Sequence, residues 1–242
     1  MKIGVLLVII FTELRMQNII KNEVKDNFFS ILGLAYTEKD YLSLDLSDSN
    51  TSELEIDLST EFALQNYLED LFQTHDAKAA YGGYLEKRNL YTRSSYFGED
   101  SSSSQRNIHL GLDIWADAGT TVYTPIIGKV HSQNDNMNFG DYGPTIILEH
   151  TIHDLKFYSL FGHLSRESLT SFEVGDTIEA AQAVARLGSN DINGNYPPHL
   201  HYQLIFDIQH YVGDYPGVSS AQDLSFYKHN CPNPNILLNF KV

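Results

Sequence analysis

Two short motifs in the second half of this chain place metal-ligating side chains at alternate positions of an apolar stretch. The first is His-Leu-Gly-Leu-Asp at 109–113, and the second is His-Leu-His at 199–201. Side chains two or four residues apart point to one face of a strand, so on extended backbone the outer residues of each motif share a face. Gly111 lies inside the first motif and removes a side chain that would crowd a bound ion.

A further histidine, His163 in Phe-Gly-His-Leu, lies between these motifs. Two imidazoles and one carboxylate make a catalytic zinc set that leaves a fourth position for water. With His163, the two motifs supply four histidines and one aspartate, so two histidines remain for proton transfer and charge stabilisation.

The amino-acid composition limits the kinds of molecule that this protein is expected to bind. The net charge is −15 with a pI near 4.9, which argues against nucleic acid, since phosphate backbones are bound through Lys and Arg. The acidic balance also disfavours tight adhesion to anionic cell walls or membranes. Cys231 is the single cysteine, so no internal disulfide is possible, and a buried or unreactive thiol is expected. At 242 residues, one main domain with an extension is the natural expectation.

The N-terminus supports two interpretations. Met1-Lys2 and the apolar run at 3–11 resemble the start of a secretory signal, but no small-residue cleavage site follows. Translation from Met16 is the alternative. We therefore expect a cytoplasmic protein, with the periplasm or cell envelope as the alternative. No stretch is long enough to span a bilayer as a helix, so no stable membrane insertion is expected beyond a possible signal.

Local patterns predict a mainly β protein. One amphipathic helix is expected over 62–72, capped by Ser59 or Thr60, and the serine-rich segment 98–105 is expected to be a loop. From residue 106 onward short β-rich runs alternate with Gly, Pro, Asn and Asp, which favours an antiparallel β-sandwich or barrel. We expect three parts: a mixed α/β N-terminal extension at 1–80, the main domain at 81–210 and an irregular, partly helical C-terminal wrap at 211–242.

The order of the motifs resembles that of lysostaphin/LytM-type zinc metallopeptidases. The matching elements, which cover about residues 106 to 207, are His-x-Gly-x-Asp at 109–113, Gly-Thr-x-Val-x-x-Pro at 119–125, Gly-x-Val at 128–130, Tyr-x-x-x-Gly-His-Leu at 158–164, Val-Gly-Asp at 174–176 and Pro-His-Leu-His at 198–201.

This resemblance implies a β-rich fold of the duplicated-hybrid-motif type with a groove over one zinc ion per chain. By position it assigns the metal to His109, Asp113 and His201, and it places His163 and His199 beside the bound water. The stretch Tyr81 to Arg88 is similar to the segment that precedes the first ligand in such enzymes, and we expect it to line the groove.

The implied activity is that of a zinc metalloendopeptidase. We assign the general-base role to His199, and oxyanion stabilisation or leaving-group protonation to His163; the two roles can be exchanged. The remaining histidines are expected to have no part in the site: His75, His131, His150, His153, His210 and His229.

The expected substrate is a peptide bond in peptidoglycan cross-links or a related short peptide. The alternative is a non-catalytic, zinc-binding regulatory or binding domain of the same fold. A histidine phosphotransfer role is disfavoured, because Asp113 is assigned to the metal. The flanks at 213–218 and 231–234 resemble a subgroup fused to phosphotransferase-like and aminotransferase-like domains, so separately encoded partners of these two kinds are a further prediction.

Overall fold

The computed structural model describes residues 18–20, 22, 28–55, 60–93 and 105–241. Its strands are β1 Tyr41–Ser43, β2 Ala79–Gly82, β3 Arg106–His109, β4 Leu112–Trp115, β5 Thr121–Tyr123, β6 Gly128–Asn136, β7 Gly143–Ile152, β8 Leu155–Gly162, β9 Thr177–Ile178, β10 Ala183–Arg186, β11 His199–Ile205 and β12 Val218–Ser220. Its helices are α2 Asp48–Glu53, α3 Glu61–His75, α4 Leu224–Asn230 and α5 Asn235–Leu238, with 3-10 turns η1 Glu38–Asp40, η2 Asn89–Arg93 and η4 Arg166–Thr170.

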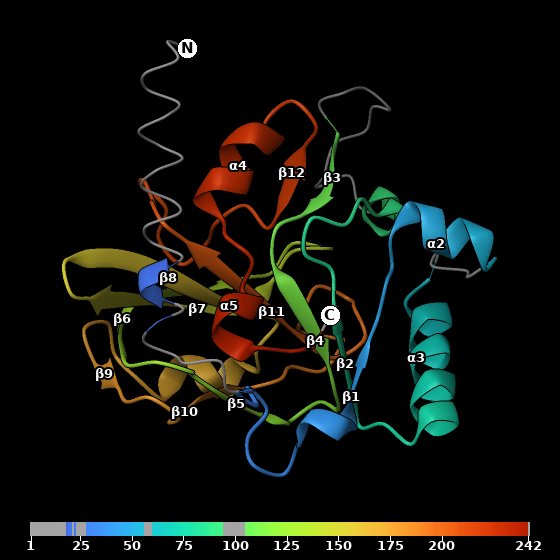
Figure 1. Cartoon of the computed structure of the whole chain (residues 1–242), viewed down its shortest axis with the longest axis horizontal. Coiled ribbons are helices and arrows are strands. Elements are labelled where there is room, and N and C mark those ends of the chain that lie inside the picture. Colours follow the sequence, from blue (N-terminus) through green and yellow to red (C-terminus); the bar gives the residue numbers. More distant parts are fainter. Residues whose placement is uncertain (1–17, 21, 23–27, 56–59, 94–104, 242) are drawn as a thin grey trace.

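One large sheet organises the molecule (Figure 1). Its order is β1-β2-β4-β11-β8-β7-β6-β9, and two small sheets, β10-β5 and β12-β3, accompany it. The predicted mainly β class is therefore confirmed. Two details differ from the expected antiparallel sandwich: most strands join one sheet, and β1 pairs with β2 in parallel. That parallel pair comes from the N-terminal part, whose strands are connected through α2 and α3.

Strand β11 lies in the middle of this sheet, between β4 and β8. The side chains of β11 are buried on both faces of the sheet. Leu200, Tyr202 and Leu204 point into the main apolar core and are fully buried. Each buried leucine stabilises the fold by about 1.5–3 kcal/mol relative to an exposed one. The opposite face of the same strand carries His199, His201 and Gln203.

The predicted helix is confirmed as α3, which begins with the Thr60 side chain accepting a hydrogen bond from the Ala63 amide. Leu64 and Leu68 on this helix pack in a separate apolar cluster with Trp115 of β4. The short helix α2 was not predicted. Together the two helices cover the β1–β2 edge of the sheet (Figure 1).

The C-terminal wrap is anchored at several points. Phe240 stacks on Tyr81 of β2 with ring centroids 4.1 Å apart, and the Phe29 amide donates to the Leu238 carbonyl. Cys231 is buried, as predicted. The three-part division of the chain stays a prediction.

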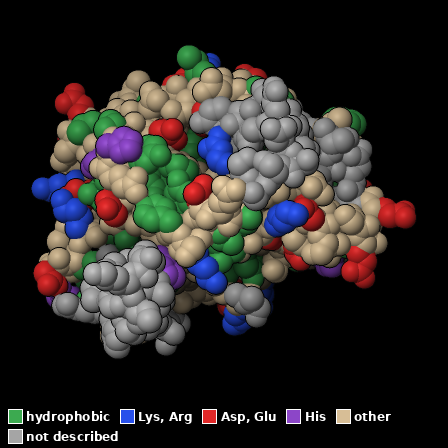
Figure 2. All heavy atoms as spheres, turned by 90° about the horizontal axis from the view of Figure 1, so that it is seen from above, with side chains coloured by type: hydrophobic (Ala, Val, Ile, Leu, Met, Phe, Trp, Pro, Cys, Tyr) green, Lys and Arg blue, Asp and Glu red, His purple; other side chains and the backbone are tan. Residues whose placement is uncertain are grey.

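Two predictions fall mainly outside the described residues: the signal-like segment within 1–17 and most of the serine-rich loop at 98–105. In the part of the chain that the structure does describe, no helix combines the length and the apolar character needed to cross a membrane. Figure 2 shows acidic and basic side chains interspersed over one face, with an apolar area near its centre.

Candidate metal centre

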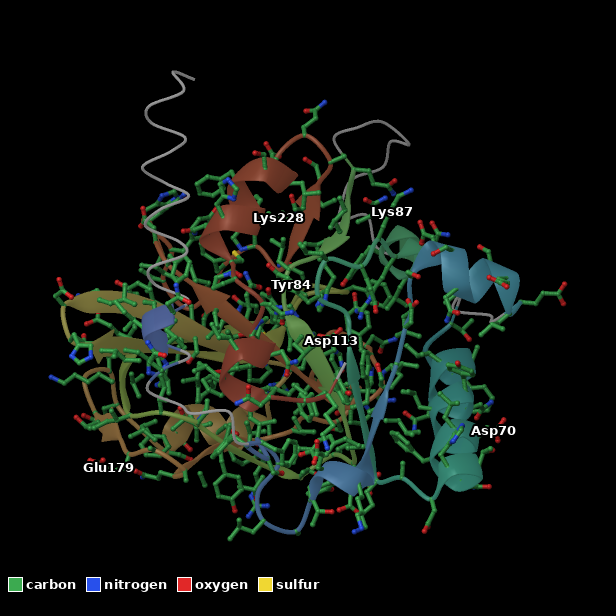
Figure 3. All side chains as sticks on the ribbon, viewed as in Figure 1. Asp70, Tyr84, Lys87, Asp113, Glu179 and Lys228 are labelled. Atoms are coloured by element: carbon green, nitrogen blue, oxygen red, sulfur yellow. The ribbon has the colours of Figure 1, made fainter. Side chains whose placement is uncertain are left out.

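Three ligand-type atoms from distant parts of the chain converge in the interior. His109 Nε2 lies 2.8 Å from His201 Nδ1, and Asp113 Oδ1 lies 3.2 Å from each of these nitrogens. All three side chains are buried. Asp113 is 2% exposed and lies near the centre of the view in Figure 3, whereas Asp70 and Glu179 lie at the outline of the molecule. The structure thus brings together the three residues to which the resemblance assigned the metal.

The backbone route between the first two residues differs from the prediction. His109 ends β3, which pairs with β12, whereas Asp113 belongs to β4 in the large sheet. The two side chains therefore converge across a change of sheet at Gly111, not along one strand. A Cβ at Gly111 would lie 2.5 Å from His201 Cε1. Glycine at this position leaves room for the His201 ring itself.

The outer nitrogens of both imidazoles are held by oxygen atoms. His109 Nδ1 lies 2.9 Å from the Gly83 carbonyl, and His201 Nε2 lies 2.9 Å from Gln203 Oε1. A Cβ at Gly83 would strike Arg88 Nη2 at 2.2 Å and His109 Nδ1 at 2.9 Å, and the φ of Gly83 is +108°. Only glycine fits there without displacing the groups that surround the first histidine.

Arg88 orients the carboxylate. Its Nη1 donates to Asp113 Oδ2 over 2.6 Å and its Nε donates to Glu86 Oε2 over 2.8 Å. The guanidinium is 1% exposed, so the bond is made away from water, where charged pairs interact strongly. One oxygen of Asp113 is thereby occupied and the other is left for the cluster. The expectation that the 81–88 stretch lines the groove is confirmed at Arg88.

Burial sets the charge of these groups. It lowers the pKa of His109 to about 4, so this imidazole is neutral near pH 7. Burial alone would raise the pKa of Asp113, but His109 and the Arg88 guanidinium outweigh it and hold that pKa well below its usual range. A neutral imidazole and an ionised carboxylate are the forms that bind a metal.

His163 and His199 lie next to this cluster, with ring centroids 4.1 Å apart. His163 Nδ1 donates to the Asn193 carbonyl over 2.7 Å, and His199 Nδ1 donates to the Pro197 carbonyl over 2.8 Å. In both neutral rings Nε2 is therefore left as an acceptor. Burial lowers the pKa of His199, and burial with the neighbouring His199 and His201 lowers that of His163 well below its usual value.

The backbone of His163 is unusual, since its φ is +62°. Non-glycine residues seldom adopt this left-handed conformation, and strained positions of this kind cluster at functional sites. Hydrogen bonds from the His163 amide to the Tyr142 carbonyl and from the Gly188 amide to the His163 carbonyl hold it in place.

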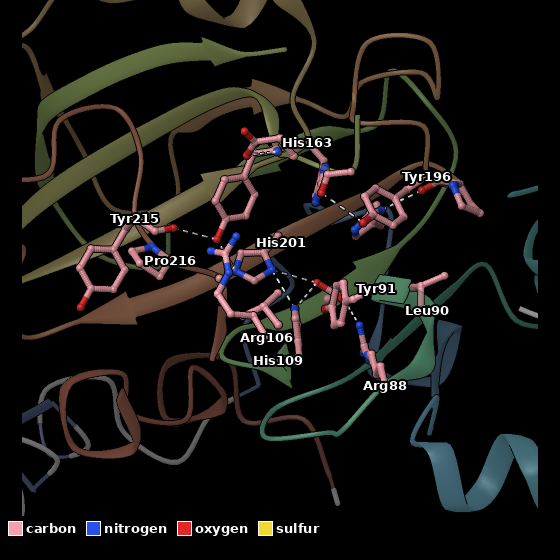
Figure 4. A pocket seen from close by; sticks show the side chains of 18 of the residues that line it. Arg88, Leu90, Tyr91, Arg106, His109, His163, Tyr196, His201, Tyr215 and Pro216 are labelled. Atoms are coloured by element: carbon pink, nitrogen blue, oxygen red, sulfur yellow. Dashed lines mark hydrogen bonds and ion pairs between the residues drawn. The ribbon is translucent and has the colours of Figure 1, made fainter. Parts of the chain in front are cut away.

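A cavity of about 230 Å³ opens over these side chains (Figure 4). All five residues that the motifs singled out line it, and so do groups that sequence reasoning did not name. Tyr142, Tyr196 and Tyr215 come from loops, with Tyr142 directly before β7, whereas Leu64 and Leu90 come from the N-terminal part. One further residue beside the site, Gln203, was missed although the sequence could have indicated it. It follows His201 by two positions and so continues the His-x-His alternation of β11.

The donor set fits zinc. Two imidazole nitrogens and one carboxylate oxygen are ligands that zinc accepts. Bonds of about 2.0–2.2 Å to a tetrahedral ion place donor atoms roughly 3.3 Å apart. The observed separations of 2.8 to 3.2 Å are close to that value. Of the described residues, these three form the group suited to a metal ion.

Part of this chain is similar in sequence to known proteins. Residues 107–212 match the family model described as Peptidase family M23, a zinc-dependent family. The chain is 30% identical over 129 residues to the L-Ala–D-Glu endopeptidase of Bacillus subtilis (strain 168), which covers 51% of this chain and 37% of that protein. The chain therefore matches little more than a third of that relative's length.

Solved structures of related proteins are similar at lower identity. A putative M23 peptidase from Pseudomonas aeruginosa is 23% identical and covers 55% of this chain and 45% of its own, with a TM-score of 0.37. The catalytic domain of lysostaphin from Staphylococcus simulans is 24% identical and covers 50% of this chain and 80% of its own, with a TM-score of 0.36.

The family match falls on the segment that carries the predicted motifs, from the first ligand-type histidine to the strand that holds the last. The resemblance inferred from those motifs is thereby confirmed. Residues 107–212 of this chain are similar to the peptidase domain of family M23, and their motifs follow the order of the lysostaphin/LytM type.

Proposed function

We propose that this protein is a zinc-dependent metalloendopeptidase that hydrolyses a peptide bond in peptidoglycan cross-links or a related short peptide. His109 Nε2, Asp113 Oδ1 and His201 Nδ1 would hold the ion. When bound, zinc supplies Lewis-acid chemistry: it polarises a carbonyl and lowers the pKa of water to about 7. The observation that carries the proposal is the pair of imidazoles, His163 and His199, whose Nε2 atoms are free to accept beside the cluster.

The two histidines supply the proton chemistry. Because both rings are neutral near pH 7, either Nε2 can accept a proton from the attacking water. After it accepts that proton, the same Nε2–H can donate to the developing oxyanion or to the leaving amine. Nδ1 stays bonded to a backbone carbonyl throughout, so the ring does not turn. We assign proton removal to His199. For His163 to donate, the proton has to pass from His199 to His163 Nε2, between rings whose centroids lie 4.1 Å apart; the two roles remain exchangeable.

The substrate proposal draws on the family and on the named relative, whose name specifies an L-Ala–D-Glu bond. A bond of this kind, a glycyl–glycyl bond and a D-alanyl–diamino-acid bond are the three to test first. The predicted phosphotransferase-like and aminotransferase-like partners have no support from the relatives and stay a prediction.

The test combines metal analysis with digestion of purified peptidoglycan and a peptide library, followed by mass spectrometry of the fragments. About one zinc per chain is expected, as for a single three-ligand site, together with new amine ends at one kind of bond. His201→Ala should remove both. Zinc without cleavage of either substrate would favour the non-catalytic domain, and a protein that takes up no zinc would overturn the proposal.

A further inference from the structure

Gln203 contacts the metal-centre residue His201 from the same face of β11. The two residues are two positions apart, and the glutamine side chain is fully buried. Its Oε1 lies 2.9 Å from His201 Nε2, and its Nε2 donates to the Pro216 carbonyl over 3.2 Å and to Cys231 Sγ over 3.3 Å. Every polar atom of this amide therefore has a partner.

These partners leave one orientation for the amide. A backbone carbonyl can only accept, so the end of Gln203 that faces Pro216 has to be the NH₂ group. The Cys231 sulfur accepts from the same group. The carbonyl end of the glutamine then faces His201, because exchanging the two ends would place its oxygen against the Pro216 carbonyl oxygen.

That orientation selects one form of the histidine. Oε1 can only accept, so the neutral His201 ring carries its hydrogen on Nε2 and its lone pair on Nδ1. Tyr142 agrees with this, because its hydroxyl donates to the Tyr215 carbonyl and turns an oxygen lone pair toward His201 Nε2, 3.4 Å away.

His109 is held in a similar way, because its Nδ1 faces the Gly83 carbonyl, which can only accept. Its lone pair is then on Nε2. Two nitrogen lone pairs and Asp113 Oδ1 thus meet within 3.2 Å with no hydrogen between them. Such an arrangement of acceptors is stabilised by a cation placed among them.

We propose that Gln203 is a positioning residue that fixes the Nε2–H form of His201, and that Pro216 and Cys231 belong to the metal centre because they fix Gln203. Both residues lie beyond 107–212, the segment that matches the family. This inference rests on the proposed zinc site, but not on the proposed hydrolysis.

The test reads the protonated nitrogen of His201 directly, by long-range ¹H–¹⁵N NMR of the full-length, zinc-free protein, with chelator competition for zinc affinity alongside. The wild type should show Nε2–H. Gln203→Leu removes the acceptor and should produce a mixture of the two forms and weaken zinc binding by about 10–100-fold, the range for groups that orient metal ligands. Gln203→Glu keeps an acceptor oxygen toward His201 but loses the donor to Pro216, so it should restore the single form and recover only part of the affinity.

Gln133 offers a matched control. It also donates Nε2 to two backbone carbonyls, of Leu169 and Phe172, at 3.0 and 3.3 Å, but it does not line the cavity. Gln133→Leu should leave zinc affinity unchanged. Wild-type His201 protonated on Nδ1, or a folded Gln203→Leu protein with wild-type zinc affinity, would overturn the inference. If Gln203→Leu does not fold, the wild-type spectrum still decides. Zinc binding without hydrolysis would instead count against the proposed function alone.

Discussion

His150 and His199 are both buried imidazoles with lowered pKa values, yet they occupy very different surroundings. His150 Nδ1 donates to the Ile127 carbonyl and its Nε2 lies 2.7 Å from Ser159 Oγ, inside the packed sheet. His199 has one backbone partner on Nδ1 and lines the cavity. Burial and a shifted pKa are therefore common to both residues, and the histidine for which we propose a function differs in lining the cavity.

The largest expected effect is on catalysis. His199→Ala removes a proton-transfer group, a change that typically costs about 10²–10⁴ in rate. Zinc content should stay near the wild-type level, because His199 is not among the three converging residues. Steady-state kinetics with parallel metal analysis checks this. A rate within threefold of wild type would show that His199 takes no more part in catalysis than His150, and His199 would have no role in the mechanism.

Replacing His150, the other histidine of the pair, should lower stability and leave catalysis unchanged. His150→Ala leaves a cavity and takes hydrogen-bond partners from Ser159 and the Ile127 carbonyl, so we expect the free energy of unfolding to fall by about 2–4 kcal/mol. Hydrolysis per folded molecule should be unchanged. Urea denaturation and kinetics on the same preparation test both halves. Loss of activity in the fully folded variant would mean that His150 also serves the site.

The pH dependence of stability provides a second test of the structural role of His150. Burial lowers the pKa of His150 to about 4 in the folded chain, against about 6.5 when unfolded. Between these values the unfolded chain binds more protons, so stability is lost as pH falls from about 6.5 to 4, by up to about 3 kcal/mol from this residue. Unfolding curves of zinc-loaded protein should show a shallower fall in His150→Ala than in wild type. Parallel curves for the two proteins would contradict the assignment.

The smallest expected effect is a change in zinc affinity on replacing Arg88, whose charged guanidinium is buried. Arg88→Lys keeps the charge but cannot donate at once to Asp113 and Glu86, so zinc affinity should fall by about tenfold. Arg166, whose Nε donates to Asp135 at the surface over 2.9 Å, is the matched control, and Arg166→Lys should change nothing. Chelator competition measures both. Equal affinities for the two variants would show that Arg88 does not orient the carboxylate.

Four of the five residues, His109, Asp113, His199 and His201, could be predicted because their motifs place metal ligands at alternate positions, and His163 followed from the Tyr-x-x-x-Gly-His-Leu element of the family resemblance. The groups that hold them were less accessible to sequence reasoning. The Gly83 carbonyl is backbone, which carries no residue signal, and the pairing of Arg88 with Asp113 depends on β2 lying beside β4. Helix α3 was readable from its apolar spacing, but the parallel β1–β2 pair was not, because strand order depends on long-range contacts.

The position of β11 between β4 and β8 has a consequence for how the protein matures. His201 is paired with Asp113 on one side and with Gly162 on the other, and a slip of one residue would turn Leu200 toward the cavity and His201 toward the core. The ligand atoms meet only when strands about 90 residues apart in sequence have found this register. Tight metal uptake would therefore come late in folding, and the time course of zinc capture by a refolding chain would report the moment at which the central sheet is complete.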